Sequence, residues 1–133
     1  MEHTAAHIET GLRGEEAVAA YLRAQGWEIL GRRWRDRRRG GLRTDIDLVA
    51  RSADGVYHFV EVKTRTGGGE IRGDFAPERA LTAGKIARMT EAAERYLAAE
   101  RITAEISVDV AAVVWGEGPN RPPVIRYYPD LRR

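Results

Sequence analysis

The chain of 133 residues contains no cysteine. Disulfide bonds and cysteine-based zinc sites are therefore excluded. It also lacks any apolar run near the roughly 20 residues that a membrane helix needs, and its first residues lack the apolar core of a secretory signal. Its 43% hydrophobic and 32% charged residues are typical of a globular protein. We expect a single domain over residues 1–133, a cytoplasmic location and no membrane partner.

The sequence has only a small excess of positive over negative charge, with a formal net charge of +2. Arginine, however, is concentrated in one segment. Residues 32–43 read RRWRDRRRGGLR, with seven arginines against one aspartate. Arginine forks fit phosphate oxygens, and an aromatic ring can stack on a base. The segment indicates a partner that is DNA or another nucleic acid; the alternative is a solvated basic loop. The residues predicted to contact nucleic acid are Trp34, Arg35, Arg37, Arg38, Arg39 and Arg65.

The spacing of apolar residues predicts an alternation of helices and strands. Residues 5–25 should form a helix that ends at Gly26, and a second helix should run from an N-cap at Thr82 to Ala99. The tight turn at residues 52–55 should join two strands as an antiparallel hairpin, and residues 64–77 should form a Gly-rich loop. This order predicts an α/β protein with a mixed sheet of about five strands flanked by helices. The expected strands cover residues 27–34, 44–51, 56–63, 105–115 and 124–128.

The strand around residues 58–65, HFVEVKTR, carries charge inside an apolar sequence. Glu61 and Lys63 point to the same side of it, because side chains alternate between the two faces of a strand. An acid and a base placed in this way form either an ion pair or a functional site. His58 lies on the opposite face, where we expect it to pack.

The preceding strand carries two aspartates, although aspartate is a poor strand former. Asp45 and Asp47 should share one face, with Ile46 and Leu48 on the other. We expect Asp47 to lie well inside the strand, and Asp45 to be solvated or paired with an arginine. A later apolar strand, SVDVAAVV, contains Asp109, which should pair with a sheet neighbour or an arginine and for which the pattern assigns no role.

Two further charges lie on faces that should be apolar. Glu15 falls within the apolar stripe of the first helix, so its carboxylate must reach water, pair or bind something. Lys85 lies on the inner face of the second helix in its first turn, where a cation opposes the helix dipole. A phosphate bound at that helix start would account for it. In both cases the alternative is a long side chain that buries its stem and keeps its head in water.

These charges suggest a metal site if the hairpin brings Asp47 to the side of Glu61 and Lys63. Carboxylate oxygens suit Mg²⁺, which is typically bound by one or two carboxylates and several waters. We predict Mg²⁺ as cofactor, with Mn²⁺ as a possible substitute. The alternative is a buried ion pair of Lys63 with one of the two carboxylates.

Several segments of the sequence resemble the YraN-like family of small bacterial proteins. They are GEEAVAAYLRAQGWEIL, TDIDLVA, HFVEVKTR, APERALTAGK and SVDV, and the resemblance runs from about Gly11 to Val114. That family has the restriction-endonuclease-like fold, whose nuclease motif is written PD-(D/E)xK. The resemblance therefore implies a restriction-endonuclease-like domain with a mixed sheet flanked by helices.

The resemblance also implies roles for individual residues. Asp47 matches the Asp of the nuclease motif, Glu61 its acidic residue and Lys63 its Lys, while Glu15 matches a first-helix Glu shared with Holliday-junction-resolving relatives. Lys85 and Asp109 match residues that the family carries; the chain departs from it by having Thr44-Asp45 where Gly-Glu is usual. The implied catalytic residues are Glu15, Asp47, Glu61, Lys63 and Lys85, and the implied metal ligands are Glu15, Asp47, Glu61 and the Val62 carbonyl.

Two functions of different classes follow. The first is a Mg²⁺-dependent endonuclease that hydrolyses DNA phosphodiesters, with branched or structured DNA as a candidate substrate. The second is a nucleic-acid-binding module of the same fold with little or no turnover. The intact Asp–Glu–Lys set favours the nuclease. Related nucleases often act as dimers, which suggests a homodimer by analogy.

Overall fold

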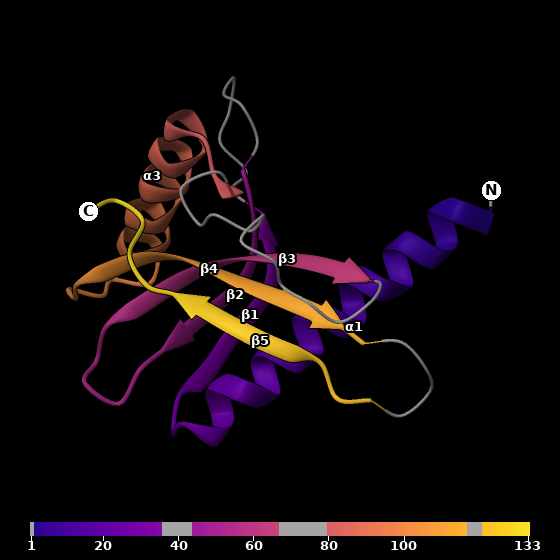
Figure 1. Cartoon of the computed structure of the whole chain (residues 1–133). Helices are drawn as coiled ribbons and strands as arrows, with labels where there is room; N and C mark the ends of the chain where they lie inside the picture. Colours follow the sequence, from indigo (N-terminus) through magenta and orange to yellow (C-terminus); the bar gives the residue numbers. More distant parts are fainter. Residues whose placement is uncertain (1, 36–43, 67–79, 117–120) are drawn as a thin grey trace.

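A computed structural model of the chain describes residues 2–35, 44–66, 80–116 and 121–133, with side chains described from residue 13 onward except for that of residue 66. The described residues form two helices and five strands (Figure 1). The elements in chain order are α1 (Glu2–Ala24), β1 (Glu28–Arg35), β2 (Asp45–Arg51), β3 (Tyr57–Thr66), α3 (Ala83–Ala99), β4 (Ile106–Trp115) and β5 (Val124–Tyr128). The predicted α/β class and five-stranded mixed sheet are confirmed.

The sheet keeps the strands in the order β1-β2-β3-β4-β5. Neighbouring strands are antiparallel except β3 and β4, which run parallel from Tyr57↔Ile106 to Thr66↔Trp115. A parallel pair needs a crossover connection, and α3 lies within it. The long pairing with β4 also carries β3 to Thr66, beyond the strand end predicted at Lys63. The rest of the predicted Gly-rich loop, residues 67–77, lies outside the described residues.

The two helices cover opposite faces of the sheet (Figure 1). Phe59 of β3 belongs to the core cluster that contains Met89 and Leu97 of α3, whereas the next residue, Val60, belongs to the cluster that contains Val18 and Leu22 of α1. Since consecutive residues of a strand point to opposite faces, the clusters define an α3 face and an α1 face. No helix in the described part of the chain is long and apolar enough to span a membrane.

Local sequence signals set the helix ends as expected. Gly26 follows α1 with a φ of 87°, a left-handed conformation that glycine adopts at low cost. Thr82 is the N-cap of α3, and its hydroxyl accepts the backbone N–H of Lys85 at 3.1 Å. This cap fixes the first turn of α3, and with it the backbone position of Lys85.

Candidate active site

Asp47 lies where the pairing of β2 with β3 ends. The register of the two strands runs from Arg51↔Tyr57 to Leu48↔Val60. At the next position, Oδ2 of Asp47 accepts the backbone N–H of Val62 at 2.8 Å. This bond fixes the carboxylate of Asp47 against β3. The hairpin therefore brings the strand that carries Asp47 beside the strand that carries Glu61, as predicted.

The side-chain alternation predicted for β2 is wrong around Asp47. Ile46 and Leu48 were expected on one face, but Ile46 packs in the cluster of the α3 face and Leu48 in that of the α1 face. The regular alternation is interrupted at the residue whose side chain bonds to the neighbouring strand. Asp45 behaves as predicted, since its side chain is 56% exposed and lies 4.0 Å from Nε of Arg35.

Glu61 and Lys63 follow Phe59 in alternation on β3 and therefore belong to the α3 face. Nζ of Lys63 lies 3.6 Å from Oε1 of Glu61, so the predicted alternative of an ion pair is present. Burial raises the pKa of Glu61, and the nearby charge of Asp47 raises it further, although both lysines oppose the shift. The ion pair with Lys63 therefore offsets only part of the free-energy cost of burying the charged Glu61 carboxylate.

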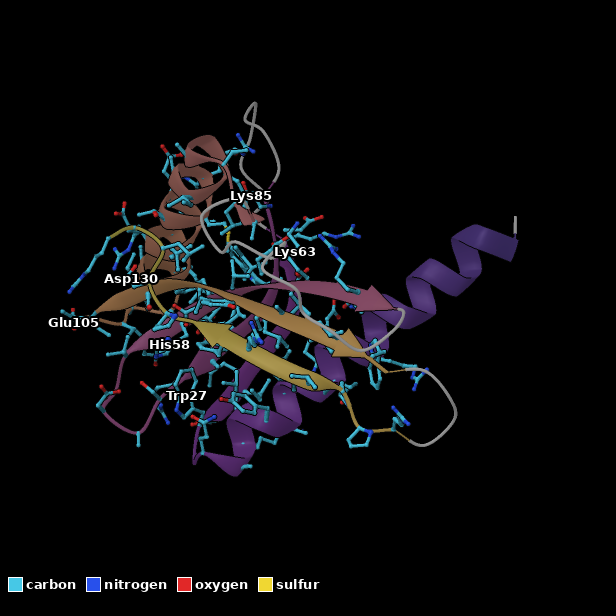
Figure 2. All side chains as sticks on the ribbon, viewed as in Figure 1. Trp27, His58, Lys63, Lys85, Glu105 and Asp130 are labelled. Atoms are coloured by element: carbon cyan, nitrogen blue, oxygen red, sulfur yellow. The ribbon has the colours of Figure 1, made fainter. Side chains whose placement is uncertain are left out.

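Asp47 is in the same electrostatic situation as Glu61. Burial raises its pKa above the ordinary value, despite the hydrogen bond from Val62 and the charges of Lys85 and Lys63. By charge, Lys85 acts more strongly than Lys63 on each of the two carboxylates. Figure 2 shows Lys63 on β3 and Lys85 at the start of α3, toward one end of the sheet. Lys85 thus lies near both carboxylates. Its position in the sequence alone did not decide between this placement and a lysine head group in water.

Glu15 approaches the same group from α1. Its side chain is 13% exposed and lies 3.7 Å from Nε of Arg33. Burial raises the pKa of Glu15, and the charge of Asp47 is the next largest cause. The neighbouring Glu16 is 57% exposed and pairs with Arg32 at 2.5 Å. The structure therefore brings together the predicted catalytic residues, which we name the carboxylate–lysine cluster: Glu15, Asp47, Glu61, Lys63 and Lys85.

The donor atoms of this cluster fit a hard cation with an incomplete protein shell. Asp47 and Glu61 present carboxylate oxygens whose charges repel one another. Among the described residues, however, no three His, Cys, Asp or Glu side chains are grouped so as to hold a metal ion. Two carboxylates with waters filling the other positions suit Mg²⁺ better than a cation that demands a complete cage. The charge of Asp47 raises the pKa of Glu15, whose ion-pair partner is Arg33.

The residues predicted to contact nucleic acid are only partly described. Arg35 and Arg65 are exposed on β1 and β3, while Arg37, Arg38 and Arg39 lie outside the described residues. Trp34 packs edge-on against Tyr96 of α3, with ring centroids 5.5 Å apart. Its role in stacking on a base stays a prediction.

A second polar group, absent from the predicted site, surrounds Asp109. This carboxylate is fully buried on β4 and, within the described residues, accepts four hydrogen bonds. Nδ1 of His58 lies at 2.6 Å, Oγ of Ser107 at 2.5 Å and the backbone N of Asp130 at 2.9 Å, and the Tyr127 hydroxyl donates the fourth bond. We call these residues the Asp109 network. His58, expected to pack, does stack on Trp27, with centroids 4.1 Å apart, but its ring also hydrogen-bonds to Asp109.

A second serine, Ser52, lies beside the Asp109 network in an arrangement that superficially resembles a hydrolytic triad. Oγ of Ser52 lies 3.0 Å from Nε2 of His58, and it also bonds to Asp54. Ser52, His58 and Asp109 are all buried. The carboxylate of Asp109 also accepts hydrogen bonds from donors other than His58. The network therefore braces β3 against β4 and the C-terminal segment. An aspartate in an apolar strand and a histidine on the neighbouring strand were the sequence signals for it.

The fold and the site define a small α/β protein with a partly buried carboxylate–lysine cluster at the end of a β-hairpin. The chain belongs to the family described as "Uncharacterised protein family UPF0102", whose model matches residues 14–113. This is the YraN-like family that the sequence resembles.

Three relatives that carry the name UPF0102 protein illustrate the similarity. The protein from Syntrophomonas wolfei is 39% identical over 85% of this chain and 90% of its own length. The protein from Rhodococcus opacus is 35% identical over 85% of this chain and 88% of its own length. A third, from Oleidesulfovibrio alaskensis, is 44% identical over 69% of this chain, but the match spans 41% of that longer relative.

Proposed function

We propose that this protein is a Mg²⁺-dependent nuclease that hydrolyses DNA phosphodiesters, with branched or structured DNA as its substrate. The observation that carries the proposal is the convergence of Asp47 and Glu61. Burial raises the pKa of both carboxyl groups, the charge of Asp47 adds to the shift of Glu61, and two lysines face them from different elements. Carboxyl groups whose pKa values are shifted by burial and by neighbouring charges are common at functional sites. Family membership, with the intact Asp–Glu–Lys set, supports the same reading.

In this proposal Asp47, Glu61 and the Val62 carbonyl hold the cation. When bound, Mg²⁺ would polarise a phosphoryl oxygen and lower the pKa of a water molecule; Mn²⁺ could replace it. Lys63 orients the attacking water by donating a hydrogen bond. Lys85, which acts on both carboxylates, donates to the phosphate as its negative charge grows. Glu15 adds negative charge beside Asp47, and the exposed Arg35 and Arg65, with the arginines of residues 37–39, hold the DNA backbone.

The test compares wild type with Asp47→Asn, Lys63→Ala and a matched control, Asp45→Asn, the same chemical change on an exposed position of the same strand. Melting temperatures are measured with Mg²⁺ and with EDTA, beside cleavage of branched, single-stranded and duplex DNA. Asn at position 47 can still accept the N–H of Val62 but removes one negative charge. This variant should be at least as stable as wild type in EDTA, gain less from Mg²⁺ and lose about 100-fold or more in cleavage.

The other variants separate the roles. Lys63→Ala should lose cleavage but keep the stabilisation by Mg²⁺, because a lysine donates and does not ligate. Asp45→Asn should resemble wild type in every assay. If Mg²⁺ stabilises wild type and Asp47→Asn equally, or if Asp47→Asn unfolds readily in EDTA, the cluster is a structural ion-pair network. DNA binding without cleavage by wild type would instead make the protein a nucleic-acid-binding module.

A further inference from the structure

α1 approaches the sheet closely at Gly14, one residue before Glu15. Gly14 is buried, and a Cβ atom placed on it would overlap Oγ1 of Thr64 on β3 and lie 3.5 Å from Cβ of Thr64. A side chain at this position would therefore require either Thr64 or one of the two backbones to shift. Glycine is a poor helix former, so its presence in the middle of α1 needs a reason of this kind.

The partner in this contact cannot easily make room. Thr64 is β-branched, so two of the three staggered positions on its Cβ carry heavy atoms and most rotations leave one of them near α1. Cγ2 of Thr64 would itself lie 3.6 Å from the added atom. The contact therefore sets the distance between α1 and β3 by steric exclusion.

The contact is adjacent in the chain to the site on both sides. Glu15 follows Gly14 on α1, and Lys63 precedes Thr64 on β3. The charge of Asp47 reaches the carboxylate of Glu15 and raises its pKa, although Glu15 comes from the helix on the other face of the sheet. A small displacement of α1 would move Glu15 directly, with one peptide unit between the contact and the carboxylate-bearing residue.

We propose that Gly14 is a positioning residue of the site: its close approach to Thr64 holds Glu15 beside Asp47. This inference rests on the proposed function for its effect on cleavage, but the placement of Glu15 can be measured without activity. The backbone N–H of Val62 donates to Asp47, so its NMR cross-peak reports on the charge around that carboxylate.

The experiment uses Gly14→Ala, Thr64→Ala, the double variant and Glu15→Gln, all in the full chain. In metal-free protein, Gly14→Ala should shift the Val62 amide in the same direction as Glu15→Gln, and the double variant should return it to the wild-type position. Cleavage should fall by about 100-fold in Gly14→Ala, as for a misplaced group in a site, and recover in the double variant. The matched control is Gly84→Ala beside Lys85, where a Cβ would lie 3.4 Å from Nη1 of Arg88; it should leave cleavage and the Val62 amide unchanged.

Combining Gly14→Ala with Glu15→Gln distinguishes a positioning role of Gly14, which acts through Glu15, from a purely structural role. If Gly14 acts through Glu15, Gly14→Ala should cause no further loss of cleavage and no further amide shift in that background, while its effect on the melting temperature persists. Equal losses in both backgrounds, or a Val62 amide that stays at the wild-type position in Gly14→Ala, would overturn the inference. If wild type neither binds Mg²⁺ nor cleaves DNA, the proposed function fails, and the amide shifts alone decide the role of Gly14.

Discussion

The carboxylate–lysine cluster and the Asp109 network use similar residue types with opposite results. Asp109 is fully buried, yet His58, Ser107, Tyr127 and a backbone N–H all donate to it. Asp47 is less buried, but burial raises its pKa. Burial also raises the pKa values of Glu15 and Glu61. Figure 2 places His58 and Trp27 toward one end of the sheet and Lys63 and Lys85 toward the other. In the Asp109 network the polar groups satisfy one another, whereas in the carboxylate–lysine cluster the burial of the carboxylates is only partly offset by the two lysines.

The largest expected effect is on the Asp109 network. Asp109→Ala leaves His58 and the other donors buried without an acceptor, so it should lower the free energy of unfolding by about 3–5 kcal/mol. Urea denaturation measures this loss. Ser107→Ala, which removes one donor and keeps the carboxylate, should cost about 1 kcal/mol. A small effect of Asp109→Ala would show that the network is not a brace and would remove the contrast between the regions.

Lys85→Ala tests the other region, where function should suffer more than stability. The ammonium group partly offsets the charges of Asp47 and Glu61, but the side chain is not fully buried. DNA cleavage or binding should fall by about 10-fold or more, while the free energy of unfolding changes by less than about 1 kcal/mol. Lys85→Arg should recover part of the binding. A strongly destabilised variant that still binds DNA normally would make Lys85 structural.

The pH dependence of stability should have opposite signs in the two regions. Burial and Asp47 raise the pKa of Glu61, so in EDTA its contribution to stability is fully present below the ordinary carboxyl pKa and is lost as pH rises through the raised value. Glu61→Gln removes this loss and should therefore gain stability relative to wild type as pH rises above the ordinary carboxyl pKa.

Asp130, whose backbone joins the Asp109 network, supplies the matched opposite case. A hydrogen bond from Arg132 lowers the pKa of Asp130, so its contribution is present above the ordinary carboxyl pKa and is lost as pH falls through the lowered value. Asp130→Asn should therefore lose stability relative to wild type as pH rises. Urea denaturation of both variants at several pH values checks the signs, and the same sign for both would remove the distinction.

The smallest expected effect concerns the exposed arginines of β1 and β3, Arg35 and Arg65. Binding to duplex DNA should weaken with salt with a log–log slope of about −0.9 for each phosphate neutralised. Arg35→Ala and Arg65→Ala should each make the slope shallower by about 0.9, with little change in melting temperature. Fluorescence titrations at several salt concentrations measure the slope. A flat salt dependence for wild type would mean that the arginines serve another purpose.

The sequence was sufficient to predict the elements and the central pair of the cluster for one physical reason. Asp47 and Glu61 lie on the two strands of a hairpin with a short turn, so local turn chemistry and alternation bring them together. The N-cap at Thr82 likewise located the start of α3 and Lys85. What local pattern could not give is the end of the β2–β3 ladder, where Asp47 bonds to Val62 and the expected faces of Ile46 and Leu48 separate.

The predicted pairing of Asp109 with a sheet neighbour is confirmed by its bond to His58, but the identity of its partners and the Gly14 contact were not predicted, because both depend on non-local packing. His58 and Asp109 are 51 residues apart and meet only through the parallel pairing of β3 with β4. That pairing has no signal in the spacing of residues, because it is set by the crossover through α3. The distance between α1 and β3 is equally invisible, since the meaning of Gly14 depends on which side chain lies opposite it.

The parallel pairing of β3 and β4 has a consequence for how the chain folds. The β2–β3 hairpin closes a short loop, but β4 can join only after the chain of α3 has looped back, and long-range pairing is slow. The hairpin carries Asp47, Glu61 and Lys63, whereas Lys85 arrives with α3. The two carboxylates therefore meet before their stronger cationic neighbour is in place. Until α3 docks, the repulsion between the two carboxylates opposes the assembly of the site.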